Sequence, residues 1–334
     1  MLNKQKKNSR LSPKAISLFA GCGGLDLGFT QEGFSVLWAN DFNHWACETY
    51  KINFGNHIVE GDIADIKTKD IPDCDLILGG FPCQDFSMLW KRGGINTERG
   101  NLYRHYVRMV DAKRPQMFIA ENVKGILTAN DGKAVEQIVG DFDKVGYRVK
   151  VNRINFADYG APQQRHRVLI VGVRKNIRID FEMPLPTHSP DNYMSSKKAL
   201  AGVEKVSHNN EHQNIANKTR KMLELIPPGG NFTSIPKSSP YYVKGMISHV
   251  YRRLHPDEPS TTIIAGGGGG TWGYHYAEPR PLTNRERARL FGYPDDFIFA
   301  GSITEVRRQI GNSVPPLGIR PIAKAVYEFF RKLK

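Results

Sequence analysis

The chain has 334 residues, 40% of them hydrophobic, which is enough for one large domain or for a core domain with a smaller one beside it. Its 47 basic and 33 acidic residues give a formal net charge of +14, which favours a polyanionic partner, with nucleic acid the leading candidate. The sequence has no apolar stretch of about 18 residues and no signal-peptide pattern, so we expect no membrane span and a cytoplasmic or nucleoid-associated location. The four cysteines form no Cys-x-x-Cys pair and no zinc-ligand spacing, which predicts reduced thiols and no metal site.

The first predicted strand covers residues 15–20 and runs into a glycine-rich turn that begins at Gly21 and leads into a helix. Glycines at such a turn allow the backbone to approach a ligand closely at the helix N-terminus. Asp26 occupies the place of the third glycine in a Gly-x-Gly-x-x-Gly pattern. A carboxylate there would repel a pyrophosphate but could accept hydrogen bonds from an amino-bearing ligand, so the turn favours S-adenosylmethionine over NAD.

A second strand is predicted at residues 35–39, and it ends just before Asp41. Asp41 lies 20 residues after Gly21, where nucleotide-binding α/β folds place an acid for the ribose hydroxyls. Phe42 either stacks on adenine or belongs to the core. Asp62 follows a short apolar pair and either contacts the adenine amino group or caps a turn or helix.

The apolar run at residues 76–78 predicts a short buried strand that leads into Gly79-Gly80-Phe81-Pro82-Cys83-Gln84-Asp85-Phe86-Ser87. Pro82 fixes its φ angle immediately before Cys83, so the thiol follows a stiffened strand end. The carboxyl ends of parallel strands are where α/β enzymes carry out chemistry, which makes Cys83 a candidate nucleophile. The alternative is that Cys83 is a small buried hydrophobic residue. The glycine-rich, basic residues 88–101 either close over a substrate or form an ordinary solvated loop.

A helix is predicted at residues 102–112 and another strand at residues 116–120, which ends at Glu121-Asn122-Val123-Lys124-Gly125. Right-handed βαβ connectivity makes this strand end a neighbour of the one that carries Cys83. Glu121 and Cys83 are therefore expected to line one crevice. The alternative interpretation of Glu121 is a helix cap or a surface acid.

After a predicted helix at 133–145 and a strand at 146–156, the motif Gln163-Gln164-Arg165-His166-Arg167 precedes an apolar run at 168–173. Arg165 and Arg167 share one face of the strand because side chains alternate with a period of two. Two guanidinium groups on one face suit an anion or a carbonyl oxygen. The alternative is an edge strand that uses arginine for solubility.

The composition changes near residue 180, and residues 186–250 are polar with few clean periodicities. This stretch predicts an irregular second domain or a long functional insertion, with a short helix at 217–226. Further helices are expected at 284–291 and 317–331. The predicted organisation is a basic flexible tail at 1–14, a catalytic and cofactor-binding domain at 15–184, a small domain at 185–300 and a returning segment at 301–334.

Six motifs, in this order, resemble those of the DNA (cytosine-5)-methyltransferases: FAGCGGLDLGF, GGFPCQDFS, ENVKG, QQRHR, RRLHPDEPSTTI and GNSVPP. They span Leu18 to Pro316, nearly the whole chain. Phe81 stands where the family often has a second proline, and Gln164 lies inside the arginine motif, but neither change removes a catalytic group. The resemblance implies an α/β fold, with a Rossmann-like S-adenosylmethionine-dependent methyltransferase domain and a smaller, irregular target-recognition domain.

The resemblance also implies the chemistry. The thiolate of Cys83 would add to carbon 6 of a cytosine, Glu121 would hydrogen-bond or protonate ring nitrogen 3, and Arg165 would hold the base carbonyl with Arg167 beside it. The methyl group of S-adenosylmethionine would then pass to carbon 5 of a base flipped out of double-stranded DNA, behind which residues 84–101 would close. The implied cofactor-binding residues are Phe19, Gly21, Gly23, Asp41, Phe42, Asp62, Ile63, Asn312 and Val314.

The predicted function is DNA (cytosine-5)-methylation by a monomer, protecting DNA in a restriction–modification system whose endonuclease is encoded separately. One alternative is a tRNA cytosine-5 methyltransferase on the same scaffold. The variable segment and the basic charge favour DNA over tRNA. The other alternative is a catalytically inactive DNA-binding regulator, against which the intact set of Cys83, Glu121 and Arg165 argues.

Overall fold

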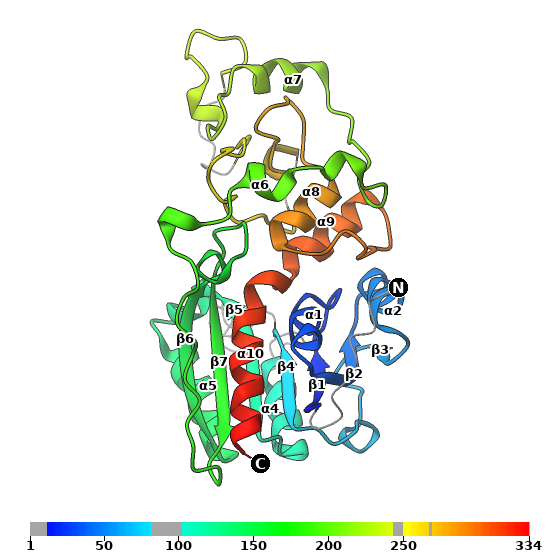
Figure 1. Cartoon of the computed structure of the whole chain (residues 1–334), viewed down its shortest axis with the longest axis vertical. Coiled ribbons are helices and arrows are strands. Elements are labelled where there is room, and N and C mark those ends of the chain that lie inside the picture. Colours follow the sequence, from blue (N-terminus) through cyan, green and yellow to red (C-terminus); the bar gives the residue numbers. More distant parts are fainter. Residues whose placement is uncertain (1–11, 82–101, 243–249, 267–268, 334) are drawn as a thin grey trace.

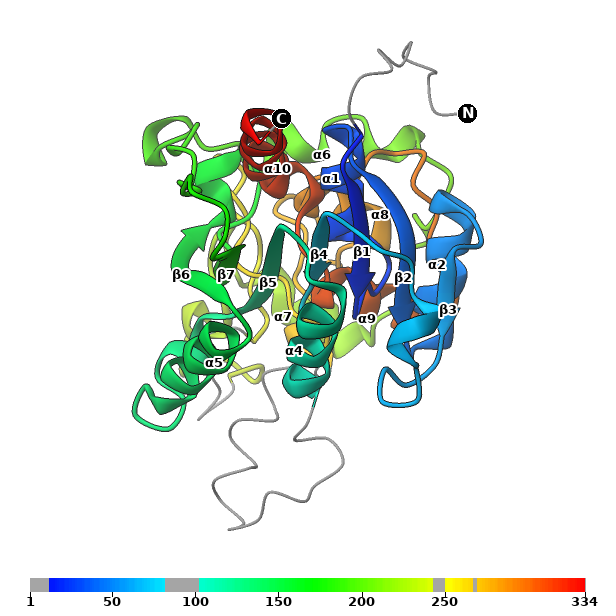
Figure 2. The same cartoon turned by 90° about the horizontal axis from the view of Figure 1, so that it is seen from below.

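The computed structural model describes residues 12–81, 102–242, 250–266 and 269–333. At its centre is a seven-stranded sheet with the order β3-β2-β1-β4-β5-β7-β6 (Figures 1 and 2). Strands β1 to β5 are parallel to one another, whereas β7 is antiparallel to both β5 and β6. The strands are β1 (Lys14–Leu18), β2 (Ser35–Asp41), β3 (Ile58–Glu60), β4 (Leu76–Gly79), β5 (Met117–Val123), β6 (Tyr147–Asn155) and β7 (His166–Arg174).

The central strands are buried because helices cover both faces of the sheet, which is why they read as continuous apolar runs. Figure 2 shows α1 (Gly24–Gln31) and α10 (Pro316–Lys332) on one face and α4 (Leu102–Lys113) and α5 (Lys133–Lys144) on the other. The first face is filled by residues such as Phe29, Phe34 and Phe330, and the second by residues such as Tyr106, Phe118 and Phe142. Each face therefore has its own apolar core.

The chain between β7 and α10 forms the second part of the molecule, above the sheet in Figure 1. In this region the described residues form short helices and irregular chain around two smaller apolar clusters. The α-helices there are α6 (Ser196–Leu200), α7 (Asn217–Glu224), α8 (Asn284–Phe291) and α9 (Ile303–Asn312), and α2 (His44–Phe54) flanks the sheet. The 3-10 helices of the chain are η1 (Thr68–Asp70), η2 (Lys124–Leu127), η3 (Phe156–Tyr159), η4 (Pro190–Asn192), η5 (Val203–Lys205), η6 (Phe232–Ser234) and η7 (Gly269–Thr271).

The predicted strands and most predicted helices are confirmed, with differences of a few residues at their ends. The short strand β3 and the helices α2 and α9 were not predicted. β3 has three residues, which is too few to show a period, and α2 has apolar and polar residues mixed around its axis. The edge-strand interpretation of Arg165 and Arg167 is wrong, because β7 lies between β5 and β6. In the described parts of the chain, no helix is long and apolar enough to cross a membrane.

Candidate active site

The site is expected where the sheet reverses its strand order. The chain builds outward from β1 to β2 and β3 on one side, and then from β4 to β5 on the other. Ligands of open α/β sheets bind at this switch point, outside the carboxyl ends of the strands. The turn after β1 and the segment after β4 flank the switch point, because β1 and β4 are paired neighbours.

The turn after β1 has an unusual backbone. Phe19 adopts a left-handed conformation with φ of 54°, which is rare for a bulky residue, and Gly21 and Gly23 have φ of 56° and 87°. The buried carboxylate of Asp41 accepts a hydrogen bond from the Gly21 amide at 2.8 Å. Burial raises the pKa of Asp41, while backbone amide donors, including Asn43, oppose that rise. Asp41 therefore holds the turn against the end of β2.

The interpretation of Asp26 as an acceptor for the amino group of a ligand is wrong, because this side chain is buried inside the protein. Its carboxylate is fully buried and accepts hydrogen bonds from the Ser17 hydroxyl at 2.6 Å and the Tyr50 hydroxyl at 2.7 Å. Burial raises the pKa of Asp26 to about 6, although both hydroxyl donors lower it. Asp26, which belongs to α1, is thus hydrogen-bonded to Ser17 of β1 and to Tyr50 of α2, and it holds these three elements together.

Two other predicted cofactor residues lie at the ends of β2 and β3. Phe42 is 71% exposed, so the interpretation of its ring as part of the core is wrong. Asp62 is exposed and its carboxylate accepts a hydrogen bond from the Ala64 amide at 2.8 Å, as in the turn-capping alternative. Ile63 is buried, and its carbonyl accepts a hydrogen bond from Arg108 at 2.7 Å. The side chain of Ile63 belongs to the core.

Asn312 and Val314 come to the same turn from the far end of the sequence. A Cβ atom built on Gly24 would lie 2.0 Å from the Ser313 hydroxyl and 2.4 Å from the Val314 carbonyl oxygen. The glycine turn and the segment after α9 are therefore in close backbone contact, which only glycine permits. The Asn312 side chain is exposed and Val314 is buried.

Glu121 and Arg167 form an ion pair at the carboxyl end of β5, with 2.9 Å between Oε1 and Nε. The antiparallel direction of β7 explains this pair, because it brings the start of β7 to the end of β5, with Arg167 opposite Val123. Both side chains are mostly buried, at 13% and 12% exposed. Burial raises the pKa of the Glu121 carboxyl, whereas Arg167 and Arg165 lower it.

The segment after β4 is joined to the same strand end. Asn122 is buried and donates a hydrogen bond from Nδ2 to the carbonyl oxygen of Phe81 at 2.9 Å. A Cβ atom on Gly80 would lie 3.1 Å from Glu121 Oε2, so the backbone passes directly beside the carboxylate. Cys83 follows Phe81 by two residues and lies outside the described residues, as do residues 84–101. Sequence reasoning did not single out Asn122, although it lies within the ENVKG motif.

Arg165 makes different contacts from those of Arg167. Its guanidinium group is buried and donates from Nη1 to the Ile263 carbonyl at 3.1 Å and from Nη2 to the Gly311 carbonyl at 2.8 Å. Its carbon Cζ lies 4.9 Å from the centre of the Phe291 ring. Burial and the nearby Arg167 lower the pKa of Arg165 to about 9. Arg165 therefore bridges the sheet to the second part of the molecule.

The described cysteines are poor nucleophiles. Burial raises the pKa of the Cys22 thiol to about 11 and the pKa values of the Cys47 and Cys74 thiols to about 12. At neutral pH such thiols carry almost no thiolate, which is the reactive form. Cys83 is the fourth cysteine of the chain.

Comparisons with known proteins identify similar chains. Residues 13–328 match the model of the C-5 cytosine-specific DNA methylase family. The chain is 59% identical to type II methyltransferase M.NgoFVII of Neisseria gonorrhoeae, with 99% of this chain and 91% of that protein covered. It is 41% identical to type II methyltransferase M.BbvI of Brevibacillus brevis, with coverage of 95% and 91%. The crystal structure of an E. coli prophage-encoded protein described as a DNA modification methyltransferase has a TM-score of 0.73 at 27% identity, covering 96% of this chain and all of that one.

Proposed function

Because the chain belongs to the C-5 cytosine-specific DNA methylase family, we propose that it methylates a flipped cytosine in duplex DNA through a covalent adduct with Cys83. The α/β fold with its Rossmann-like domain and the activity of a DNA (cytosine-5-)-methyltransferase of the restriction–modification type agree with the sequence predictions. The observation that carries the proposed mechanism is the buried Glu121–Arg167 pair, held beside the backbone that leads to Cys83.

The turn after β1 fits S-adenosylmethionine, which supplies an electrophilic methyl group when bound. Phe42 offers an exposed ring for adenine, and the strained backbone at Phe19 is the kind of feature that a ligand site retains. Asp41 would take the ribose hydroxyls, and Gly21 and Gly23 would give close backbone access; the hydrogen bond that joins Asp41 to the turn supports this arrangement. Asp62 would receive the adenine amino group, and the main chain of Ile63 would lie beside the adenine ring. Asn312 and Val314 would close the site from the segment after α9.

The proposed reaction begins at the thiolate of Cys83, which forms a bond to carbon 6 of the cytosine ring. The electrons of the 5,6 double bond then make carbon 5 nucleophilic. Glu121 would share a proton with ring nitrogen 3 and so withdraw negative charge from the ring, and the rise in its pKa through burial favours the protonated form that this role needs. After methyl transfer, carbon 5 loses its proton and the bond between sulfur and carbon 6 breaks, which restores the ring and the thiolate.

The contacts of the two arginines favour different roles for them. Sequence reasoning assigned the base carbonyl to Arg165, but two of its nitrogens donate to main-chain carbonyls of Ile263 and Gly311. Arg167 is paired with Glu121 and is the better candidate for the base carbonyl. We therefore propose Arg167 as the group that contacts the base and Arg165 as a positioning residue.

We further infer that the chain acts as a monomer in the cytoplasm, on nucleoid DNA, and that a separately encoded endonuclease cuts the unmethylated site. The relatives are type II methyltransferases, which act on DNA, and this supports DNA over tRNA as the substrate. The segment from about residue 186 to residue 250 would read the site.

The proposed function is tested by expressing the chain in cells without cytosine methylation and sequencing their genomic DNA at the resolution of single 5-methylcytosines. We expect methylation at one short sequence. Labelled S-adenosylmethionine with duplex DNA or tRNA provides the comparison, and label in tRNA alone would contradict the proposal.

The role of Cys83 is tested by Cys83→Ser. We expect this variant to lose methyl transfer and covalent trapping on duplexes that carry 5-fluorocytosine at the mapped site, because a serine hydroxyl is far less ionised than a thiol. Binding to DNA and to the cofactor should be kept. Cys74→Ser is the matched control and should behave as the wild type. Methyl transfer at the wild-type rate by Cys83→Ser would remove the nucleophile assignment.

A further inference from the structure

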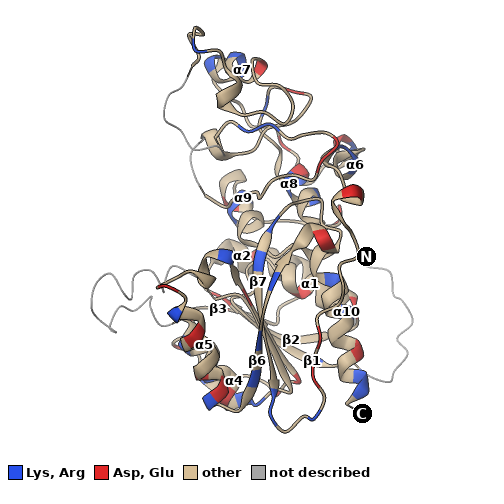
Figure 3. Ribbon diagram, turned by 90° about the vertical axis from the view of Figure 1, so that its left-hand side faces the viewer, with Lys and Arg blue, Asp and Glu red and all other residues tan. Residues whose placement is uncertain are grey.

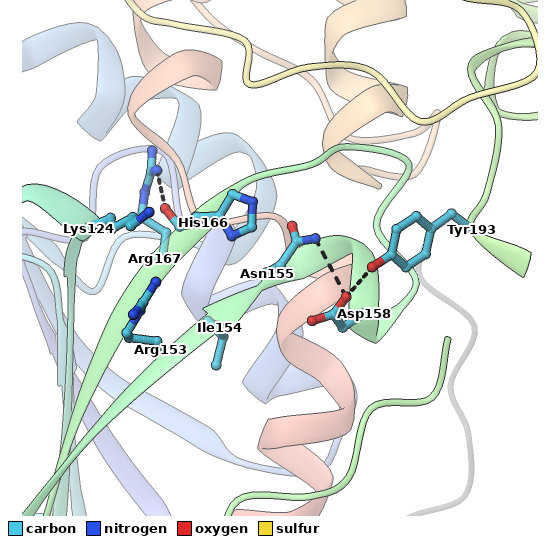
Figure 4. A pocket seen from close by; sticks show the side chains of 8 residues that line it. All are labelled: Lys124, Arg153, Ile154, Asn155, Asp158, His166, Arg167 and Tyr193. Carbon is cyan, nitrogen blue, oxygen red and sulfur yellow. Dashed lines mark hydrogen bonds between the residues drawn. The ribbon is translucent and has the colours of Figure 1, made fainter. Parts of the chain in front are cut away.

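A basic pocket opens beside the Glu121–Arg167 pair. It has a volume of about 510 Å³, and its lining includes the basic side chains of Lys124, Arg153 and Arg167 and the imidazole ring of His166 (Figure 4). Figure 3 shows lysine and arginine positions on β6 and β7. Because Arg167 belongs both to this pocket and to the ion pair, the pocket adjoins the proposed catalytic site.

Three neighbouring strands build the pocket. The β6–β7 register puts Asn155 opposite His166 and Ile154 opposite Arg167. Lys124 follows the end of β5 directly, at the start of η2. The cationic side chains therefore come from rigid sheet ends, which is where a site that must hold a ligand in register is best placed.

The charges of the pocket are available to an anion. Arg153, Lys124 and His166 are exposed, and within the described residues no hydrogen bond or ion pair holds the side chain of Arg153 or Lys124. The acid in the lining, Asp158, already accepts hydrogen bonds from the Tyr193 hydroxyl and from Asn155 Nδ2. Lys124 and Arg153 are thus cations of the pocket without a partner among the described residues, and a phosphodiester, which carries one negative charge, is a ligand that they suit.

We propose that this pocket binds a phosphodiester of the DNA backbone next to the flipped cytosine, with Arg153 as the cation that contacts it. The proposal rests on the proposed function and extends it to a named residue. An arginine fork matches two phosphate oxygens, whereas sites for small organic ligands are lined mainly by apolar side chains. The lining here is mostly charged or polar, which favours the backbone of a polyanion.

The proposal is tested with Arg153→Ala, Arg153→Lys and the control Arg178→Ala, which removes an exposed arginine outside this pocket. Binding to a short fluorescent duplex of random sequence is measured by anisotropy over a series of KCl concentrations. We expect Arg153→Ala to reduce the slope of log K against log salt by about 0.9, the value for one lost phosphate contact. Arg153→Lys should keep the slope, and Arg178→Ala should match the wild type.

Equal slopes for Arg153→Ala and Arg178→Ala would overturn the proposal. Binding of inorganic phosphate that depends on Arg153, without any change in the DNA slope, would also overturn it, because the pocket would then be a small-anion site. Methyl transfer to genomic DNA is measured separately. If the slope depends on Arg153 but the wild-type protein transfers no methyl group, the phosphate contact is supported and the proposed function is contradicted. If the wild-type protein transfers methyl groups but Arg153→Ala leaves the slope unchanged, the proposed function is supported and the phosphate contact is contradicted.

Once the target cytosine is mapped, its position relative to the pocket can be measured. Single backbone phosphates around that cytosine are replaced one at a time by neutral methylphosphonates. We expect one replacement to abolish the effect of Arg153→Ala on affinity, because the arginine and the phosphate then belong to one contact. Additive effects at every phosphate flanking the cytosine would contradict the assignment.

Discussion

Glu121 is the residue proposed above to exchange a proton with the target base, and its surroundings suit that role. It is mostly buried, it pairs with Arg167 at 2.9 Å, and burial raises its pKa. The ion pair holds the side chain in one direction, and burial raises the pKa of the carboxyl above that of a surface acid although Arg167 and Arg165 oppose the rise. A general acid needs both properties.

Glu121→Gln should therefore separate catalysis from binding. The amide keeps the size of the side chain and one oxygen for Arg167, but it has no acidic proton. We expect the single-turnover rate of methyl transfer to fall by about 10²–10⁴, with DNA affinity within a few-fold of the wild type. Glu182→Gln, at an exposed glutamate paired with Lys150, is the control. Equal single-turnover rates for the two variants would exclude Glu121 from proton transfer.

The burial of Asp26 leads to a prediction about how the free energy of unfolding depends on pH. Burial raises its folded-state pKa to about 6, above its ordinary value of 3.8, so the folded protein binds a proton more readily than the unfolded chain between these values. The free energy of unfolding should accordingly fall as pH rises from about 4 to 6. Asp26→Asn should reduce that slope, to which the buried acids Asp41 and Glu121 also contribute, and should stabilise the fold at pH 8 by roughly 1–2 kcal/mol, measured by urea unfolding. Asp70→Asn, at an exposed acid, should leave the slope unchanged, and a steeper slope in Asp26→Asn would contradict the account.

At the scale of elements, the segment before β7 is joined to residues 260–263. The backbone N–H of Gln164 donates to the Ser260 carbonyl at 2.8 Å, and the backbone N–H of Ser260 donates to the Pro162 carbonyl at 3.0 Å. Arg165 adds two hydrogen bonds to carbonyls of the second part of the molecule. The strand that carries Arg167 is thus joined directly to the second part of the molecule, through residues that follow the segment proposed to read the DNA site.

Arg165→Ala should weaken this junction. It leaves the carbonyls of Ile263 and Gly311 without their buried donor, and each such loss costs about 1–3 kcal/mol. We expect lower thermal stability and faster proteolysis between the two parts, with partial rescue by Arg165→Lys and no effect of Arg178→Ala. Wild-type stability combined with lost methyl transfer would instead assign Arg165 to the base carbonyl.

At the scale of the whole molecule, the sequence allowed much of the sheet to be predicted. Apolar runs bounded by glycine and proline mark β1, β4 and β7, and the order of the motifs indicates which strand ends meet. It did not predict that β7 is antiparallel, and that direction is what brings Arg167 to Glu121. Nor could spacing distinguish Arg165 from Arg167, since they are two residues apart and share a face. Their different roles follow from what each packs against, which depends on residues about 100 positions away.

Both ends of the folded chain lie together, far from the site. The Ser35 amide bonds to the Pro13 carbonyl at 3.0 Å, and the Phe34 ring packs 6.0 Å from that of Phe330 near the end of α10. β1 begins and α10 ends at this edge of the sheet, whereas Glu121 lies near the carboxyl end of β5. An affinity tag or a fluorescent reporter fused after α10 would therefore project from the side of the sheet opposite Glu121. Immobilisation through this end would leave the proposed active site directed into solution.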